Sequence, residues 1–412
     1  MANSLSASFP EYWSRRMQLK HYRTDVFRDI ASFEEQATLK RGDTVHRPYR
    51  SNLVVNSLGS EGSYTRQDVT DTDESLTISS EKEVSFYVRD LDTIQSNYPE
   101  INVYADDAAR ALSNGIDGDV LAQVANALNV VDDADLGGTS GNGITLTESN
   151  VFDTFVYANE KLDRRNAPTE GRFACLSPQF CRVLKSALIA RESPWGDKVG
   201  ERGYLGMYDG MAIYKTNGSY WTGVLYLATQ PTDADTVTIN VPDSQGTRTT
   251  ITFTFKTTLG STAGNVLIGG SADVARANLA TLIGTPGTTT ANGVALSSAN
   301  QNLLKGFTAT NDNTADTCTV TAAGKGFVVV GETLTAAADI WTAATQIQHN
   351  MFGVKGCVDL VIQVLPNMKV KGRDGYIGDD IVSWNVYGLK TFVEGARNMV
   401  AVKVRTDQFL AS

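Results

Sequence analysis

Residues 104–128 decide the fold; they read YADDAARALSNGIDGDVLAQVANAL. Apolar side chains recur in this stretch every four positions, which is the spacing of one buried face of an α-helix. The pattern predicts a helix of many turns over about 102–127. Gly115 and Gly118 fall inside it, and glycine costs a helix about 1 kcal/mol relative to alanine, so we expect a bend or a close packing contact there. The apolar stripe consists of Ala108, Leu112, Ile116, Val120, Val124 and Leu128.

Two shorter helices and a buried strand follow this helix. A helix is predicted over 149–163, where Ser149 or Asn150 can cap the first turn. Another is predicted over 178–190, with Pro178 in its first turn. The segment GRFACLSP between them, residues 171–178, is typical of a buried strand.

Residues 43–90, before the helix, have the pattern of extended strands. Leu76, Ile78, Val84, Phe86 and Val88 largely alternate with polar residues, which suits strands with one covered face. We expect a long two-stranded ribbon, which needs another surface to lie against because an isolated ribbon is only marginally stable. The first fifty residues are mildly basic and aromatic without a long apolar stripe, and we interpret them as an arm that packs on a partner.

Residues 226–345 differ in composition from the rest of the chain. Charged side chains become sparse, threonine is frequent, and short β-rich runs such as DTVTIN and TTITFTFKT alternate with glycine and asparagine turns. One helix is expected over 272–282. We interpret this segment as a module inserted into a surface loop, because loop insertions raise the closure entropy only slowly.

Composition excludes several classes of protein. The 412 residues are enough for a real core, and the net charge of -10, from 36 basic and 46 acidic residues, argues against a surface that binds nucleic acid strongly. The opening MANSLSASFPEYW lacks the pattern of a signal peptide, and the most apolar run, residues 357–365, is too short to span a membrane. We therefore expect a soluble chain made in a cytoplasm, with no membrane partner.

A catalytic constellation is not expected. The three histidines, His21, His46 and His349, are too far apart for a metal motif, and the four cysteines form no CxxC pair. Lys325 in AAGKGF lacks the upstream glycine and the following serine or threonine of a phosphate-binding loop. The sequence thus predicts no enzyme, no cofactor and no metal. Extended arms without an active site suggest that the surfaces themselves carry the function.

The order of these parts resembles the major capsid proteins of tailed bacteriophages, the family with the HK97-type fold. The resemblance covers residues 1–225 and 346–412. It is carried by RGDTVHRP (41–48), DVTDTDESLTISSEKEVSFYVRDLDTIQS (68–96), the helix at 104–128, GYLGMYDGMAIYKTNG (203–218) and DDIVSWNVYGLKTF (379–392). Each segment is an unspecific pattern of glycine and apolar residues, and the resemblance lies in their order and spacing.

The resemblance implies an α+β, HK97-like capsid fold with an additional, mostly β module. The expected parts are an N-terminal arm (1–50), an E-loop ribbon (51–95), a peripheral domain with a spine helix (96–195), the axial domain and the remainder of the peripheral domain (196–225 and 346–412), and the module (226–345). Candidate contacts between subunits on the arm and the E-loop are Tyr12, Trp13, Glu61, Tyr64, Arg66, Asp68, Asp71 and Glu74.

The implied function is assembly of hexamers and pentamers into an icosahedral shell around phage DNA, in a virion built in the host cytoplasm. A portal and a scaffolding protein are expected partners, and packaged double-stranded DNA should touch the wall only weakly and without specificity. Some members cross-link through a loop lysine, but this ribbon has only Lys82, well down the returning strand. The module can stabilise the subunit, contact neighbouring capsomers or bind host surfaces.

Two other functions remain open at this point. One is the shell of an encapsulin-like cellular compartment, which has the same fold and holds cargo enzymes. The other is a virion surface adhesin or tail component, in which the inserted module is the active part.

Overall fold

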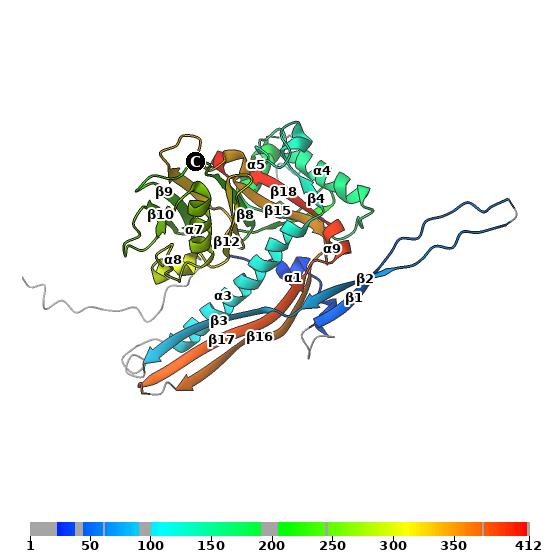
Figure 1. The fold of residues 1–412 in the computed structure, drawn as a ribbon. Coiled ribbons are helices and arrows are strands. Elements are labelled where there is room, and N and C mark those ends of the chain that lie inside the picture. The colour runs from blue at the N-terminus through cyan, green and yellow to red at the C-terminus, as the bar shows by residue number, and fades with distance from the viewer. Residues whose placement is uncertain are drawn as a thin grey trace, which may run out of the picture.

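The structure is a computed structural model, and it describes residues 23–37, 44–60, 62–89, 100–190, 205–243, 246–372 and 375–409. Figure 1 shows a compact body with two extensions, a long loop on one side and a narrow three-stranded sheet below. The arm residues before Arg23 lie outside the described residues, so the prediction for residues 1–22 is not tested.

The helix predicted first is present as α3 (Glu100–Ala122), and its last turn tightens into a 3-10 turn, η4 (Gln123–Asn126). The predicted stripe from Ala108 to Val124 is buried, but Leu128 lies beyond the helix and is 52% exposed. A close packing contact is found at Gly118, where an added Cβ would lie 2.9 Å from the Cα of Gly324. Only glycines allow the two backbones to approach this closely.

The lower extension is an antiparallel sheet in the order β16-β17-β3, and α3 packs on it. Its strands are β3 (Ser80–Arg89), β16 (Asp359–Gly372) and β17 (Gly378–Lys390). Asp119 of α3 accepts hydrogen bonds from two strands of this sheet. Lys82 Nζ of β3 donates to Asp119 Oδ2 at 2.6 Å, and the Tyr387 hydroxyl of β17 donates to the same oxygen. The helix and the sheet are therefore joined by polar as well as apolar contacts.

The ribbon predicted over 43–90 is divided between two sheets. β1 (Thr44–Arg50) pairs with β2 (Asp71–Thr77) in an antiparallel register from Thr44–Thr77 to Arg50–Asp71. The following strand, β3, pairs with β17 instead. The predicted two-stranded ribbon is therefore present over residues 44–77 and does not extend to residue 90. Alternation within a strand does not say which distant strand it pairs with.

A nine-stranded sheet forms the centre of the body. Its main path is β12-β13-β8-β15-β5-β7-β6, and β18 joins β15 to β4. The strands are β4 (Asn129–Val131), β5 (Arg172–Leu176), β6 (Met207–Tyr208), β7 (Met211–Lys215), β8 (Tyr220–Tyr226), β12 (Phe307–Asp312), β13 (Thr317–Ala322), β15 (Ile347–Val354) and β18 (Met399–Arg405).

Helices cover both faces of this sheet. α4 (Val151–Arg164) and α5 (Pro178–Ile189) pack on one face with Ala174 and Leu176 of β5, while Phe173 and Cys175 face the second half of α3. The predicted strand at 171–178 is β5, buried along its length. Asn150 occupies the cap position of α4, but its side chain accepts from the Thr147 N–H at 2.8 Å and makes no capping bond to the helix.

The segment predicted as a module has a core of its own. β9 (Thr236–Pro242), β10 (Arg248–Lys256), β11 (Asn265–Leu267) and β14 (Val329–Thr333) form a four-stranded sheet, joined by α7 (Ala272–Gly284) and α8 (Ser298–Leu303). Within the segment, β12 and β13 extend the central sheet through β8, so the module shares a sheet with the body. Figure 1 shows it on the left of the body and α4 and α5 on the right.

Short elements complete the structure: α1 (Phe27–Ile30), η2 (Glu34–Gln36), η5 (Asp133–Leu136), η6 (Ala343–Thr345), α9 (Val393–Arg397) and η7 (Asp407–Phe409). The chain enters and leaves the module side by side, because the Tyr226 N–H donates to the Ile340 oxygen at 2.9 Å and Thr342 donates to Val224 at 3.0 Å. Adjacent entry and exit points suit an inserted segment. The domain limits themselves remain a prediction.

Candidate interaction surface

The loop between β1 and β2, residues 51–70, exposes large apolar side chains. Val55 is 98% exposed and Tyr64 82% exposed. A folded monomer rarely leaves several such groups in water on one segment, so a patch of this kind marks an interaction site. The exposed apolar residues of the loop are Leu53, Val54, Val55, Leu58, Tyr64 and Val69.

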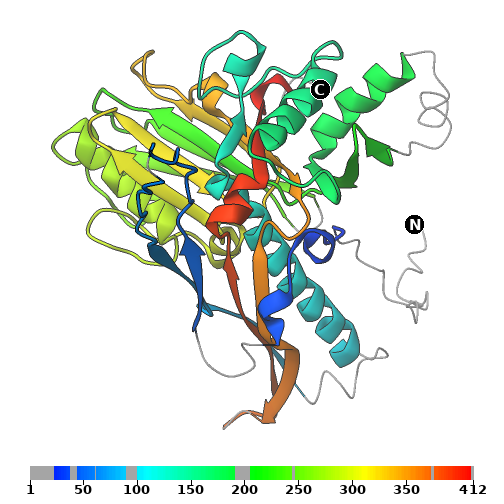
Figure 2. The same cartoon turned by 90° about the vertical axis from the view of Figure 1, so that its right-hand side faces the viewer.

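Few hydrogen bonds hold the two sides of this loop together. Near its base, the Ser51 N–H donates to the Thr70 oxygen at 3.0 Å, and the Gln67 side chain bonds the backbone of Val54 in both directions. At its tip, Gly59 donates to Ser63 at 2.8 Å. The loop extends away from the body (Figure 1), and Figure 2 shows the molecule from the side to which it points. Most of its backbone groups are therefore free to bond with another surface.

The base of the loop, in contrast, is anchored to the body by Arg47 of β1. Its guanidinium donates to Glu35 Oε1 at 2.8 Å and lies 3.3 Å from Asp359 Oδ2. The same group stacks 4.4 Å from the centre of the Phe392 ring. Below it, Leu76 and Val361 form a small buried cluster with Phe392. One side chain thus connects β1, η2, β16 and the segment before α9.

A second set of contacts joins β1 and β2 to α9. The Tyr49 hydroxyl donates to Glu394 Oε1 at 2.8 Å, which raises the pKa of Tyr49 chiefly through this hydrogen bond. Glu74 Oε2 accepts from the Val393 N–H at 3.3 Å. The direction in which the loop leaves the body is therefore set by contacts on both sides of its base.

Another apolar surface lies at the far end of the three-stranded sheet. Ile377 is 79% exposed there, and Val370 on the edge strand β16 is opposite the buried Ile381 in the register. The edge of β16 has no partner strand among the described residues. The exposed apolar residues here are Leu365, Met368, Val370, Tyr376 and Ile377.

The sequence-predicted contact residues fall into three groups. Tyr12, Trp13 and Glu61 lie outside the described residues. Tyr64, Arg66 and Asp68 are exposed on the loop and Asp71 is exposed at the start of β2. Glu74, in contrast, is half-buried and bonded within the chain. Contact of these residues with another subunit stays a prediction. Arg47 and the tip of the three-stranded sheet were not predicted, because neither belongs to an alternating or helical pattern that marks it out.

Arg23, where the arm joins the body, lies at a polar junction that the sequence did not reveal. It donates to the backbone oxygens of Asn114 and of Gly324, the latter at 2.6 Å, and its guanidinium is 3.5 Å from Asp117. Asp117 is fully buried and also accepts from the Val26 N–H at 2.9 Å. Burial lowers the pKa of Arg23 and raises that of Asp117. The junction links the arm, α3 and the module.

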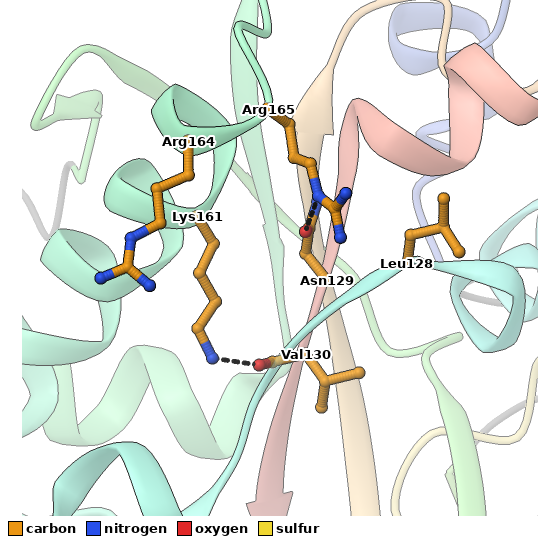
Figure 3. A pocket seen from close by; sticks show the side chains of 6 residues that line it. All are labelled: Leu128, Asn129, Val130, Lys161, Arg164 and Arg165. Atoms are coloured by element: carbon orange, nitrogen blue, oxygen red, sulfur yellow. Dashed lines mark hydrogen bonds between the residues drawn. The ribbon is translucent and has the colours of Figure 1, made fainter.

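A cavity of about 420 Å³ opens where the last turn of α4 meets β4 (Figure 3). Lys161 Nζ donates to Asp135 Oδ2 at 2.6 Å and to the backbone oxygen of Val130. Arg165 donates through Nε to Asn129 Oδ1 at 3.3 Å. We call this cavity the basic pocket; it is lined by Leu128, Asn129, Val130, Lys161, Arg164 and Arg165.

Within the described ranges, no cluster of three or more histidine, cysteine, aspartate or glutamate side chains could hold a metal ion. The described helices include none of the length and apolar character needed to cross a membrane. Among the described residues, the exposed loop, the tip of the three-stranded sheet and the basic pocket are therefore the candidate sites for binding another molecule.

Comparison with known proteins rests on structure alone. No protein-family model matches the chain, and no curated protein matches it in sequence. Solved structures do match over nearly the whole chain. A structure from Mycobacterium phage Che8 has a TM-score of 0.58 at 15% identity, and the match covers 97% of this chain and 98% of that one.

Two further matching structures are those of phage capsids. The capsid structure of the cyanophage P-SCSP1u has a TM-score of 0.54 at 12% identity and covers 97% of this chain and 94% of that one. The mature capsid of bacteriophage PhiM1 has a TM-score of 0.51 at 10% identity, with coverages of 96% and 92%. The chain therefore has the α+β fold of phage capsid proteins along nearly its full length, module included.

Proposed function

We propose that this chain is the major capsid protein of a tailed bacteriophage, and that its copies assemble into the hexamers and pentamers of an icosahedral shell around double-stranded DNA. The observation that carries the proposal is the exposed apolar loop, on a chain with the fold of capsid proteins. The role is structural rather than catalytic, and the place of the protein is the virion.

The energetics of the loop support assembly. Burying one large apolar side chain contributes roughly 1.5–3 kcal/mol, and the loop carries six that the monomer leaves in water. A contact that covers even half of them offsets a large part of the entropy lost when two subunits associate. Because every copy has both a loop and a body, identical contacts can repeat around a closed ring.

The charge of the chain suits a container for DNA. With a net charge of -10, the wall repels a polyanion on average, so packaged DNA touches it only weakly and can leave again. A portal and a separate scaffolding protein are the partners that such a shell needs. For the module we rank stabilisation of the subunit and its neighbours first, since its core is continuous with Trp221 and Leu225 of strand β8 in the body.

Cross-linking through Lys82 is not part of the proposal. The ammonium lies 2.6 Å from Asp119 and 5.7 Å from the Tyr387 ring centre, on β3 rather than on the loop. These contacts give Lys82 a role in joining α3 to its sheet.

Expression of the chain alone and with candidate scaffolding proteins tests the proposal. Size-exclusion chromatography followed by negative-stain microscopy should show closed particles of uniform diameter. A stable monomer or trimer under all assembly conditions would contradict it and would favour an adhesin or tail component. Particles that form in cells around a protein cargo, without DNA, would favour a cellular compartment.

A further inference from the structure

One cation of the basic pocket, Arg165, has donor groups that no described residue of the chain accepts from. Arg164 pairs with Glu160 one turn earlier on α4, with 2.5 Å between Nη2 and Oε1, and Lys161 pairs with Asp135. Arg165 pairs with no carboxylate among the described residues; its side chain donates from Nε to the Asn129 amide oxygen at 3.3 Å. The two terminal amino groups of Arg165 therefore remain available.

Asn129 fixes the orientation of Arg165. Its side chain is nearly buried, and Nδ2 donates to the backbone oxygens of Arg397 at 2.9 Å and Met399 at 3.3 Å. Because the amide nitrogen is used in this way, Oδ1 must point at Arg165. Figure 3 shows Arg165 on the opposite side of the hollow from Arg164. The free edge of its guanidinium offers two parallel N–H groups, which is the geometry that a carboxylate binds with both oxygens.

An apolar group stands next to this cation. Leu128, which ends the apolar stripe of the sequence but lies outside α3, is 52% exposed at the rim of the pocket. Duplex DNA is bound by rows of cations that follow its phosphates. One unpaired arginine in a concave site with a leucine beside it instead suits a protein segment that has a carboxylate next to an apolar side chain.

The chain itself has an excess of the complementary group, with 46 acidic residues against 36 basic ones. We propose that the basic pocket is a contact site between copies: a carboxylate of a second copy binds Arg165, and a neighbouring apolar side chain of that copy covers Leu128. This contact rests on the proposed function, since it forms only when copies assemble. It fixes the alignment of neighbours, as charge pairs at interfaces do.

Zero-length cross-linking tests the contact directly. Shells are assembled from equal amounts of unlabelled and ¹⁵N-labelled Arg165→Lys subunits, treated with a carbodiimide that couples amines to carboxylates, and analysed by mass spectrometry. We expect linked peptides that join position 165 to an acidic peptide of the other isotope, in shells and not in dissociated subunits. Links from position 165 only within one isotope, for example to Asp135 or Glu160, would overturn the proposal. Lys355, which is exposed on the same body, reports background coupling.

Charge reversal gives an independent readout. Arg165→Glu and the matched control Lys355→Glu change the net charge equally, and both side chains are exposed, so both variants should keep the wild-type melting temperature. We expect Arg165→Glu to lower the yield of shells about tenfold, which corresponds to about 1.4 kcal/mol, and Lys355→Glu to leave it unchanged. Equal yields would overturn the proposal, as would normal shells that merely lose DNA. Failure of the wild-type chain to form shells would instead count against the proposed function.

Discussion

Arg47 is the side chain on which the position of the loop most depends. Its partner Asp359 is nearly buried, and burial raises the pKa of that carboxyl group. Burial alone would lower the pKa of Arg47, but the hydrogen bond to Glu35 and the charge of Asp359 raise it overall. The three groups therefore depend on one another, and loss of the arginine leaves a carboxylate without its counter-ion in a mostly dry site.

Replacing Arg47 with methionine tests this role. We expect Arg47→Met to lower the free energy of unfolding by about 1–3 kcal/mol, because a charged hydrogen-bonding partner is lost. Arg66→Met, on the exposed loop, is the matched control and should change it by less than about 0.5 kcal/mol. Chemical denaturation of both variants measures the difference. Similar stabilities for the two would show that Arg47 does not anchor the loop.

Asp235 gives the module a predictable dependence on pH. Burial alone would raise its pKa, but the N–H groups of Thr232 and Thr335 and the Thr335 hydroxyl lower it overall. A carboxyl group with a lowered pKa in the folded state stabilises the protein above its unfolded pKa of about 4, and this stabilisation is lost as pH falls through the folded value.

The variant Asp235→Asn should therefore be less stable than the wild type by about 2 kcal/mol at neutral pH. The difference should shrink as the pH falls from about 4 through the lower pKa of the folded state, where the wild-type carboxyl group also becomes protonated. Thermal unfolding at several pH values measures it, with Asp68→Asn on the exposed loop as control. A difference between wild type and Asp235→Asn that does not depend on pH would contradict the assignment.

At the scale of elements, α3 joins the central sheet of the body to the three-stranded sheet. Its second half covers one face of the central sheet, and along its length it packs on the three-stranded sheet. Residues of three other segments meet it at Arg23, Gly324 and Tyr387. Damage to its buried face should therefore affect the whole fold.

A charge in that face provides the test. Val120 is fully buried in α3, and Val120→Asp should cost several kcal/mol because the carboxylate would have no partner. Val156 on α4 is 55% exposed, so Val156→Asp should be close to neutral. Soluble yield and melting temperature distinguish the two. A Val120→Asp protein as soluble and stable as the control would show that this face is not buried.

The loop should behave in the opposite way, because it contributes to contacts between copies and little to the fold. Deleting residues 53–68 and closing the gap with a short glycine linker keeps β1 and β2, including Glu74 and its bond to Val393. We expect a soluble subunit with an unchanged melting temperature and no closed shells. Normal shells from this variant, seen by electron microscopy, would contradict the role of the loop.

Local sequence patterns predicted where helices and strands lie much better than they predicted which strands pair with each other. The period of four residues located α3, and Pro178 marked the first turn of α5, since both signals act within one or two helical turns. The pairing of β3 with β17 and of β13 with β8 depends on residues far apart in the sequence: Arg89 lies opposite Gly378, and Tyr226 lies opposite Thr317. The buried Asp117 and Arg276 were not predicted either, because their partners, such as Val26 and Asn311, lie in other segments.

At the scale of the whole molecule, a well-packed body contrasts with two surfaces that expose apolar side chains. Three large buried clusters stabilise the body, whereas the loop and the tip of the three-stranded sheet leave large apolar side chains in water. Figure 1 shows that both surfaces extend beyond the body, where other copies can reach them. A monomer would gain nothing from either extension, but a shell of identical subunits can bury both.

Cryo-electron microscopy of particles assembled from the wild-type chain tests this account most directly. It predicts closed shells in which Leu53, Val55 and Tyr64 of each copy are buried against a neighbouring copy. Closed shells with these side chains in solvent, or a chain that remains monomeric at every concentration and salt condition and with every scaffolding protein tried, would contradict it.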